Sequence, residues 1–371
     1  MRYFGPVICV MILLGWSLSG TIAAESDLEL KYSVKLEEKD RILGDLTGNF
    51  LIYGRPYIKM YDHDGNRLFS RRLKNNVKPV LSPAGKYLAL VTYADHSPTE
   101  LKTIKLELYN PKGERLLKID KPAATLFELS DKGWFIGVEG VAGIAPNRVH
   151  IYDPSGKDIK TLIFQTFRKA VFAPAGDHIV VDKGSEGLEL FDLQGNSVSS
   201  VPVCRNYLLS RDARYWACFG GGIFNLYQGD SLVKNLQVTP AEIIDMAFDI
   251  QSNLLVILAE KRLRLLDLVD GKLRWEYRLN EPEQYFTALS LSPDGRHVAC
   301  GMDINRGDSI PKAERHIEGE ALLFPVEGAS PTRHSEKYTL WDIGLPRVAL
   351  TASQNSLIIM TKEKVARYSY R

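Results

Sequence analysis

A reverse turn that recurs along the chain constrains the fold more than any other feature. The clearest copy lies in the stretch Leu289–Cys300, where Ser292-Pro293-Asp294-Gly295 separates two runs of apolar, β-prone residues. Pro293 presets φ near −65°, Asp294 can accept a hydrogen bond from its own backbone, and Gly295 tolerates a positive φ. The stretch therefore predicts two antiparallel strands joined by a tight turn.

This turn occurs eight times. Four further copies are clear and three are degraded; they begin at Leu81, Leu129, Phe172 and Leu209, and at Leu46, Phe248 and Leu350. Each of the first six turns is followed by an aromatic residue or Leu, a polar residue and a Gly-containing turn, which begin at Tyr61, Tyr109, Tyr152, Phe191, Tyr227 and Leu266. Each unit thus predicts four strands, A to D, with short A–B and C–D turns.

Units of this size cannot bury their own apolar faces, so they must stack, and four strands per unit predict an all-β propeller. Eight blades in the roughly 345 residues of a mature chain have about 43 residues each, close to the length typical of WD-type blades. Seven blades are the alternative and require that one apparent unit be an insertion.

The two ends of the chain complement each other. Arg41–Leu46 supplies strand A of the first unit, which leaves the alternating stretch Leu30–Leu36 over. At the other end, Val348–Ala352, Leu357–Thr361 and Val365–Tyr370 supply only three strands. We therefore expect the N-terminal strand to complete the last blade and close the ring, which removes exposed sheet edges.

The N-terminus has the pattern of a secretory signal peptide over residues 1–24, followed by a single propeller domain over 25–371. Arg2 precedes the apolar run Val7–Trp16, and a small and polar segment ends near Ala23 or Ala24. We expect a periplasmic or extracellular protein with no membrane span in the mature chain; an uncleaved anchor is the alternative. With 47 basic and 45 acidic residues, nothing predicts nucleic-acid binding.

Three cysteines remain after the signal peptide. Cys204 and Cys218 flank one A–B turn almost symmetrically, which favours a disulfide between strands A and B. Cys218 and Cys300 occupy the same position in their own units. The alternative is that all three are buried small hydrophobic residues.

Repeated Ser-Pro-Asp-Gly turns, together with strands that end in Tyr-Asp, resemble the WD-like repeats of TolB-type and related secreted bacterial propellers. The resemblance covers about residues 30–371 and implies a binding scaffold more often than an enzyme. Trp341-Asp342 matches the dipeptide of WD repeats, but only 8 residues separate Asp342 from Leu350, too few for strands D and A. Strand C of unit seven is instead expected at Ala321–Phe324.

No motif predicts a cofactor, a metal ion or a catalytic site. The segment Asp62–Asn66 resembles the start of a Ca²⁺ loop but occupies the C–D turn of its unit, and no bidentate Glu follows. Gly220–Gly222 joins two strands, so it is interpreted as a tight B–C loop instead of a phosphate cradle. The tripeptide Arg306-Gly-Asp308 is interpreted as a chance match.

Loop length is the remaining indication of function. The B–C loops share one side of a propeller with the D–A loops, and three are predicted to be long: Tyr93–Thr103, Glu139–Asn147 and Met302–Glu320. Long loops on a rigid scaffold commonly carry binding sites. The candidate binding residues on these loops are Asp95, His96, Glu100, Asp303, Arg306, Asp308, Arg315 and His316.

We therefore expect a non-catalytic scaffold that binds a protein or glycan partner in the envelope or outside the cell. The alternative is a glycan-active lyase or hydrolase with its site at the mouth of the central channel. That alternative requires His96, His316 or His150 to converge with carboxylates near the axis.

Overall fold

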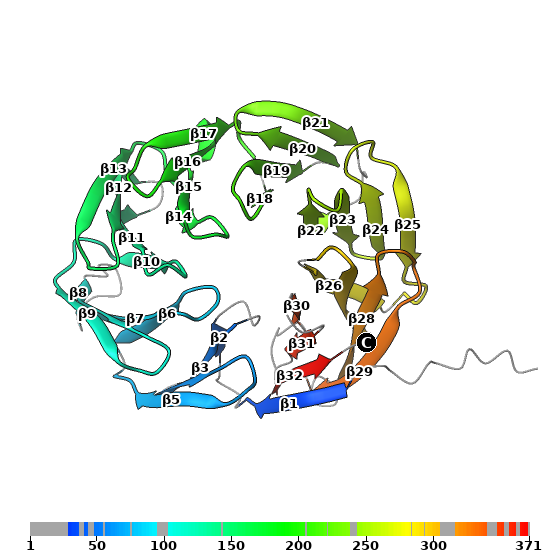
Figure 1. Cartoon of the computed structure of the whole chain (residues 1–371), viewed down its shortest axis with the longest axis horizontal. Helices are drawn as coiled ribbons and strands as arrows, with labels where there is room; N and C mark the ends of the chain where they lie inside the picture. Colours follow the sequence, from blue (N-terminus) through cyan, green and yellow to red (C-terminus); the bar gives the residue numbers. More distant parts are fainter. Residues whose placement is uncertain are drawn as a thin grey trace, which may run out of the picture.

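The chain forms a ring of eight four-stranded antiparallel sheets in the computed structural model, which confirms the eight-bladed propeller (Figure 1). The structure describes residues 29–36, 41–43, 48–54, 56–74, 76–94, 103–141, 144–204, 206–220, 222–237, 243–282, 284–292, 294–304, 316–339, 347–351, 356–360 and 364–369. The predicted signal peptide over residues 1–24 and the dipeptide Trp341-Asp342 lie outside these residues.

Within each blade, strands A to D run from the centre of the ring to its rim. The strands of blades 1 to 4 are β2 (Arg41–Leu43), β3 (Phe50–Gly54), β4 (Tyr57–Tyr61), β5 (Arg67–Arg72); β6 (Val77–Leu81), β7 (Leu88–Tyr93), β8 (Thr103–Tyr109), β9 (Arg115–Asp120); β10 (Leu126–Leu129), β11 (Phe135–Val141), β12 (Ile144–Tyr152), β13 (Asp158–Phe164); β14 (Lys169–Phe172), β15 (His178–Asp182), β16 (Leu188–Asp192) and β17 (Ser197–Val201). A 3-10 turn, η1 (Gly184–Glu186), joins β15 to β16.

The strands of blades 5 to 8 are β18 (Asn206–Leu209), β19 (Tyr215–Gly220), β20 (Ile223–Gln228), β21 (Ser231–Gln237); β22 (Ile243–Asp249), β23 (Leu254–Ala259), β24 (Arg262–Asp267), β25 (Leu273–Arg278); β26 (Gln284–Leu291), β27 (His297–Ile304), β28 (His316–Pro325), β29 (Thr332–Thr339); β30 (Arg347–Thr351), β31 (Ser356–Met360), β32 (Lys364–Ser369) and β1 (Glu29–Lys35). Among the described residues, no helix is long and apolar enough to cross a membrane.

The A–B turns are held by a serine side chain. The Oγ of Ser292 accepts hydrogen bonds from the backbone N–H groups of Arg296 (3.1 Å) and His297 (2.9 Å), and Gly295 adopts a φ of +66°. The same Oγ contact recurs at Ser82, Ser130 and Ser210. The repeated turn predicted from the sequence is confirmed, and at these four turns it carries serine hydrogen bonds that the sequence analysis did not anticipate.

The C–D turns are held by a carboxylate or amide side chain. In blade 1 the Oδ1 of Asp62 accepts hydrogen bonds from the N–H groups of Asp64 (2.9 Å) and Asn66 (2.8 Å). Equivalent pairs of bonds occur at Asn110, Asp153 and Asp192. The carboxylate of Asp62 thus shapes the turn, which supports the interpretation of Asp62–Asn66 as a turn.

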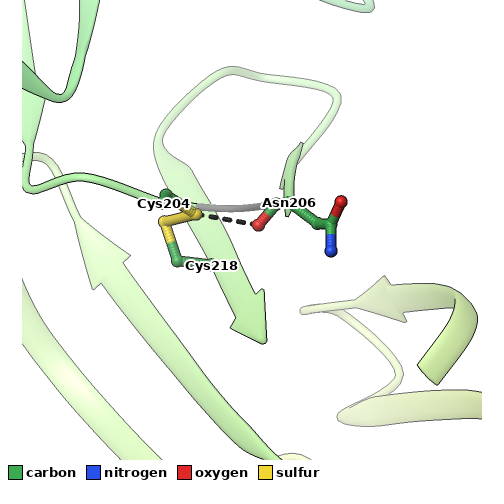
Figure 2. The surroundings of a disulfide bond; sticks show 3 residues. All are labelled: Cys204, Asn206 and Cys218. Atoms are coloured by element: carbon green, nitrogen blue, oxygen red, sulfur yellow. Dashed lines mark hydrogen bonds between the residues drawn. A yellow bond between two sulfur atoms is a disulfide. The ribbon is translucent and has the colours of Figure 1, made fainter. Parts of the chain in front are cut away.

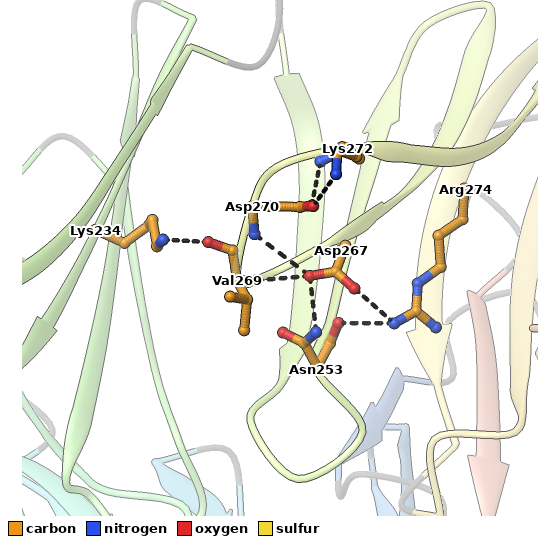
Figure 3. Close-up of polar contacts among 7 residues, drawn as sticks. All are labelled: Lys234, Asn253, Asp267, Val269, Asp270, Lys272 and Arg274. Carbon is orange, nitrogen blue, oxygen red and sulfur yellow. Dashed lines mark hydrogen bonds and ion pairs between the residues drawn. The ribbon is translucent and has the colours of Figure 1, made fainter.

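Neighbouring blades also meet at the C–D turns. The turn glycine has a positive φ, and a Cβ there would lie only 2.6–3.1 Å from a side chain on the outermost strand of the preceding blade at Gly65, Gly113, Gly156, Gly195 and Gly271. In blade 6, Asp267 accepts hydrogen bonds from Asn253, Arg274 and the backbone of its own turn (Figure 3). Lys234, from blade 5, donates to the carbonyl oxygen of Val269 in this turn.

The described core consists of apolar clusters between successive blades. Strand B is usually buried on both faces, and all six residues of β23 are buried because blades 5 and 7 cover both of its sides. A strand that is buried on both faces needs continuous apolar sequence instead of alternation. The strand B segments show this continuous pattern, whereas the outer D strands alternate.

The N-terminal strand closes the ring as predicted. β1 pairs antiparallel with β32, with Val34 opposite Val365, and lies at the rim of blade 8 (Figure 1). The buried side chain of Arg367 donates from Nη1 to the carbonyl oxygen of His63 (2.7 Å) and to the carboxylate of Asp64 (3.2 Å). Blade 8 is thus joined to the first C–D turn of the chain.

Cys204 and Cys218 form a disulfide, with their Cα atoms 5.6 Å apart (Figure 2). The expected placement across strands A and B is wrong for one of them. Cys218 lies on β19 opposite Tyr207, but Cys204 precedes β18 and belongs to the D–A connection from blade 4. Cys300 is the fourth residue of its strand B, as Cys218 is of its own, and it is a buried free thiol.

We expect the contact between Gly65 in blade 1 and Tyr32 in blade 8 to stabilise the folded protein. Gly65→Ala should lower the free energy of unfolding by about 2–4 kcal/mol, because a Cβ at a φ of +79° would also meet the ring of Tyr32 at 2.6 Å. The matched control is Gly229→Ala, where φ is +56° and nothing lies within 4 Å, so only about 1 kcal/mol of backbone strain is expected. Equal losses in urea denaturation would contradict the proposed role of the contact.

Candidate binding face

The ring has two sides with different connections. The side that carries the B–C and D–A connections is called the loop face, and the side that carries the A–B and C–D turns is called the turn face. The sequence analysis predicts that all eight candidate binding residues belong to the loop face. Six of the eight, Asp95, His96, Glu100, Arg306, Asp308 and Arg315, lie outside the described residues. The other two lie on paired strands.

Two of the three predicted long loops are shorter than expected. β11 and β12 pair up to Val141 and Ile144, so most of Glu139–Asn147 is a β-hairpin. β27 and β28 pair from His297 out to Ile304, opposite Glu318, so of Met302–Glu320 only residues 305–315 lie outside the two described strands. Polar side chains mark these segments as loops in the sequence, but backbone pairing continues through them.

Asp303 is part of the protein interior instead of an exposed loop. It lies on β27 opposite Tyr285 and is 1% exposed, and the Tyr285 hydroxyl donates to its Oδ2 at 3.2 Å. Burial, followed by the negative charge of Asp303 and the hydrogen bond to it, raises the pKa of Tyr285 to about 12. His316 begins β28 and pairs with Thr339. The expectation that Asp303 is a solvent-facing binding residue is therefore wrong.

A set of exposed apolar side chains on the loop face was missed in the sequence. Seven large apolar residues at strand ends or connections there are 40–61% exposed: Tyr57, Ile104, Leu126, Ile163, Val203, Ile223 and Ile244. Tyr57 and Ile104 begin strand C in blades 1 and 2, and Leu126 begins strand A in blade 3. In the sequence the six residues at strand ends are indistinguishable from core residues, because buried strand residues are apolar too. The seventh, Val203, lies two residues after β17.

The innermost strands carry isolated charges near the loop face. Lys78, Glu128 and Lys169 lie on β6, β10 and β14, the A strands of three consecutive blades. Burial raises the pKa of Glu128, and the positive charges of Lys78 and Lys169 oppose this rise. None of the described residues on the A strands is a histidine, so a histidine general base is not found there.

His150 is the one member of the predicted histidine set whose side chain is described, and it does not lie at the channel mouth. Its Nδ1 is 3.2 Å from Asp158 Oδ2 and its Nε2 is 3.3 Å from Glu139 Oε2. It is buried on β12, the third strand out from the centre. His150 therefore links strands within blade 3 and does not supply the convergence at the channel mouth that the enzyme alternative requires. Among the described residues, no cluster with the composition of a metal site occurs.

No family model and no curated protein matches the chain. Solved propellers do match. The C-terminal WD40 domain of Sif2 is 9% identical with a TM-score of 0.61, and covers 93% of this chain and 98% of its own. The WD40 domain of SCAP from fission yeast is 12% identical with a TM-score of 0.57, and covers 92% and 98%. At these identities the likeness shows the fold alone, a β-propeller similar to those two WD40 domains.

We expect Asp303 to contribute to stability through Tyr285. Asp303→Ala should lower the free energy of unfolding by about 1–3 kcal/mol, because it leaves a part-buried hydroxyl without this acceptor. Tyr285→Phe should cost less, and the double variant should cost less than the sum, as measured by urea denaturation. Wild-type stability of Asp303→Ala would contradict this role.

Proposed function

We propose that this chain is an exported, non-catalytic scaffold of the TolB-like type that binds a protein partner through its loop face. The observation that carries the proposal is the set of seven exposed apolar side chains on that face. Eight other large apolar side chains, 36–62% exposed, lie early in the outermost strands or on a C–D turn, at the rim of the other side. The loop-face set differs from them because five of its seven members lie on the inner A and C strands. Exposed apolar groups on one surface commonly mark interaction sites.

A protein partner is favoured over a glycan by the chemistry of these side chains. Six of the seven are aliphatic, and Tyr57 is the one aromatic residue. Aliphatic side chains gain free energy by being removed from water against another apolar surface. On blades 1 to 3, Tyr57, Ile104 and Leu126 lie on consecutive blades, so one partner surface could cover all three.

Export is supported by the N-terminal pattern and by the disulfide. Arg2 and the apolar run Val7–Trp16 are typical of a signal peptide, and disulfides persist in oxidising compartments. The Cys204–Cys218 disulfide would be stable in the periplasm or outside the cell. Export also fits a partner in the envelope.

Export predicts the thiol content of the mature protein. When the full chain is produced in a bacterium, the periplasmic product should begin after Ala23 or Ala24 and lack Cys9. Denatured protein should then carry one reactive thiol, Cys300, before reduction and three after it. The matched control, Cys218→Ala, should carry two in both conditions. An intact N-terminus, or three thiols before reduction, would contradict the proposal.

Partner capture tests the loop face. In pull-downs from envelope extract, the double variant Ile104→Asp/Leu126→Asp should recover a partner at least about tenfold less well than the wild type, because it places charge in an apolar interface. Replacement of residues 305–315 by a short Gly/Ser link tests the connection of blade 7 in the same assay.

The matched control introduces the same charge on the turn face, at Leu116→Asp/Leu273→Asp, where both residues are about as exposed. This variant should capture the partner as well as the wild type does. Equal capture by both double variants would contradict the proposal. The choice of a protein partner would be contradicted if the chain bound a glycan array and the loop-face variant captured the same proteins as the wild type.

A further inference from the structure

A pocket of about 310 Å³ lies between blades 1 and 2, beside the C–D turn of blade 2. It reaches the turn face, because its wall includes the C–D turn residues Lys112 and Gly113, whereas Arg71 lies one residue from Arg72, which pairs with the loop-face residue Tyr57. Its lining comes from the outermost strand of blade 1 and from strands B and C of blade 2: Phe69, Ser70, Arg71, Leu88, Leu90, Tyr109, Lys112 and Gly113.

Arg71 leaves this space open, because it occupies a position that is apolar in six of the seven other blades; blade 7 has His334 there. Arg71 pairs with Ile58, a buried residue that faces blade 2. At the same register on the outermost strand, six other blades have an apolar side chain that packs into the cluster between blades: Val34, Ile119, Leu162, Val201, Leu236 and Tyr277. In blade 1 the arginine is exposed and does not fill this space.

A second difference between the blades also leaves room in this space. The C-strand tyrosine is opposite a large aromatic residue in other blades: Phe50 stacks on Tyr61 in blade 1, and Phe135 stacks on Tyr152 in blade 3. In blade 2 the partner of Tyr109 is the smaller Leu88. The floor of the pocket is therefore apolar and wider than the corresponding site in those two blades.

The wall of the pocket is positively charged. Arg71 and Lys112 contribute two cations, and none of the lining residues is acidic. Arg71 donates from Nη1 to the neutral hydroxyl of Tyr109 at 2.5 Å, and its guanidinium carbon lies 5.0 Å from the centre of that ring. Among the described residues, Arg71 forms no ion pair within 4 Å.

Two described carboxylates of blade 2 lie close to the lining residues in the sequence. Glu114 follows Gly113 and accepts a hydrogen bond from Asn110 at 2.6 Å, and Glu107 lies on β8. Glu107 is buried and faces blade 1, and its oxygens contact Lys105 at 2.9 Å and Arg115 at 3.0 Å. Burial would raise the pKa of Glu107, but the hydrogen bonds from these two cations, together with the charges of Lys105 and Arg71, hold it below its usual value. The cations around the pocket therefore outnumber the carboxylates, which favours an anionic ligand.

We propose that this pocket binds a small organic anion, with an apolar body against Phe69, Leu88 and Leu90 and a carboxylate at Arg71 and Lys112. A guanidinium group binds a carboxylate through charge-assisted, bidentate hydrogen bonds, which are stronger than its bond to a neutral phenol. The volume is at the lower end for small-molecule sites, so the apolar body is limited to about the size of a phenylalkyl group.

The experiment titrates the full mature chain calorimetrically with three probes that share one apolar body: phenylbutyrate, phenylbutanol and phenylbutylamine. The wild type should bind the acid at least about tenfold more tightly than the alcohol, and should not bind the amine. Equal binding of acid and alcohol, or no binding of the acid, would overturn the proposal.

Two variants locate the site. Arg71→Ile introduces the residue type found at this register in blade 2, so it should fold, and it should lower the affinity for phenylbutyrate by at least about tenfold. Lys112→Gln removes one charge but keeps the backbone N–H that bonds to Asn110 in the turn, and it should lower this affinity severalfold. The matched control, Arg72→Gln, changes the next residue of β5, whose side chain points to the other side of the sheet. Unchanged affinity in Arg71→Ile and Lys112→Gln, or an equal loss in Arg72→Gln, would overturn the assignment.

Discussion

The ring depends on close approaches between the C–D turn of one blade and the outermost strand of the preceding blade, which occur at five of its turns. The turn glycines adopt a positive φ, and at positions such as Gly65 and Gly195 there is no room for a Cβ, because a neighbouring side chain lies 2.6 Å away. Tyr32, which meets Gly65, lies on the N-terminal strand. The kind of contact that joins successive blades along the chain therefore also joins the first blade to the last, where the two ends of the chain meet.

A scaffold held in this way tolerates changes at its surface positions. The backbone register of blade 1 matches that of its neighbours, although Arg71 replaces the apolar residue that fills the equivalent position elsewhere. Such a replacement creates a pocket without moving a strand. On the loop face, exposed residues such as Ile104 and Leu126 likewise leave the pairing of their strands unchanged, because their side chains lie at strand ends.

Local chemistry explains which features could be predicted. The serine and aspartate turns, the four strands per unit and the closing strand all follow from hydrogen bonds or pairings between short, recognisable segments. The site was less predictable. Asp303 has the composition of a loop residue, but β27 continues past it and buries it beside Tyr285. Polar sequence does not reveal whether a neighbouring strand continues to pair.

By itself, the sequence determined the eight repeated units, their turns and the complementarity of the two chain ends, because turn geometry depends on residues within four or five positions of each other. Only the tertiary structure decided which apolar residues are exposed, where the Arg71 pocket opens, and that His150 lies between Glu139 and Asp158 away from the axis. Those properties depend on what the adjacent blade or strand covers, and strand periodicity is the same whether a side chain is covered or not.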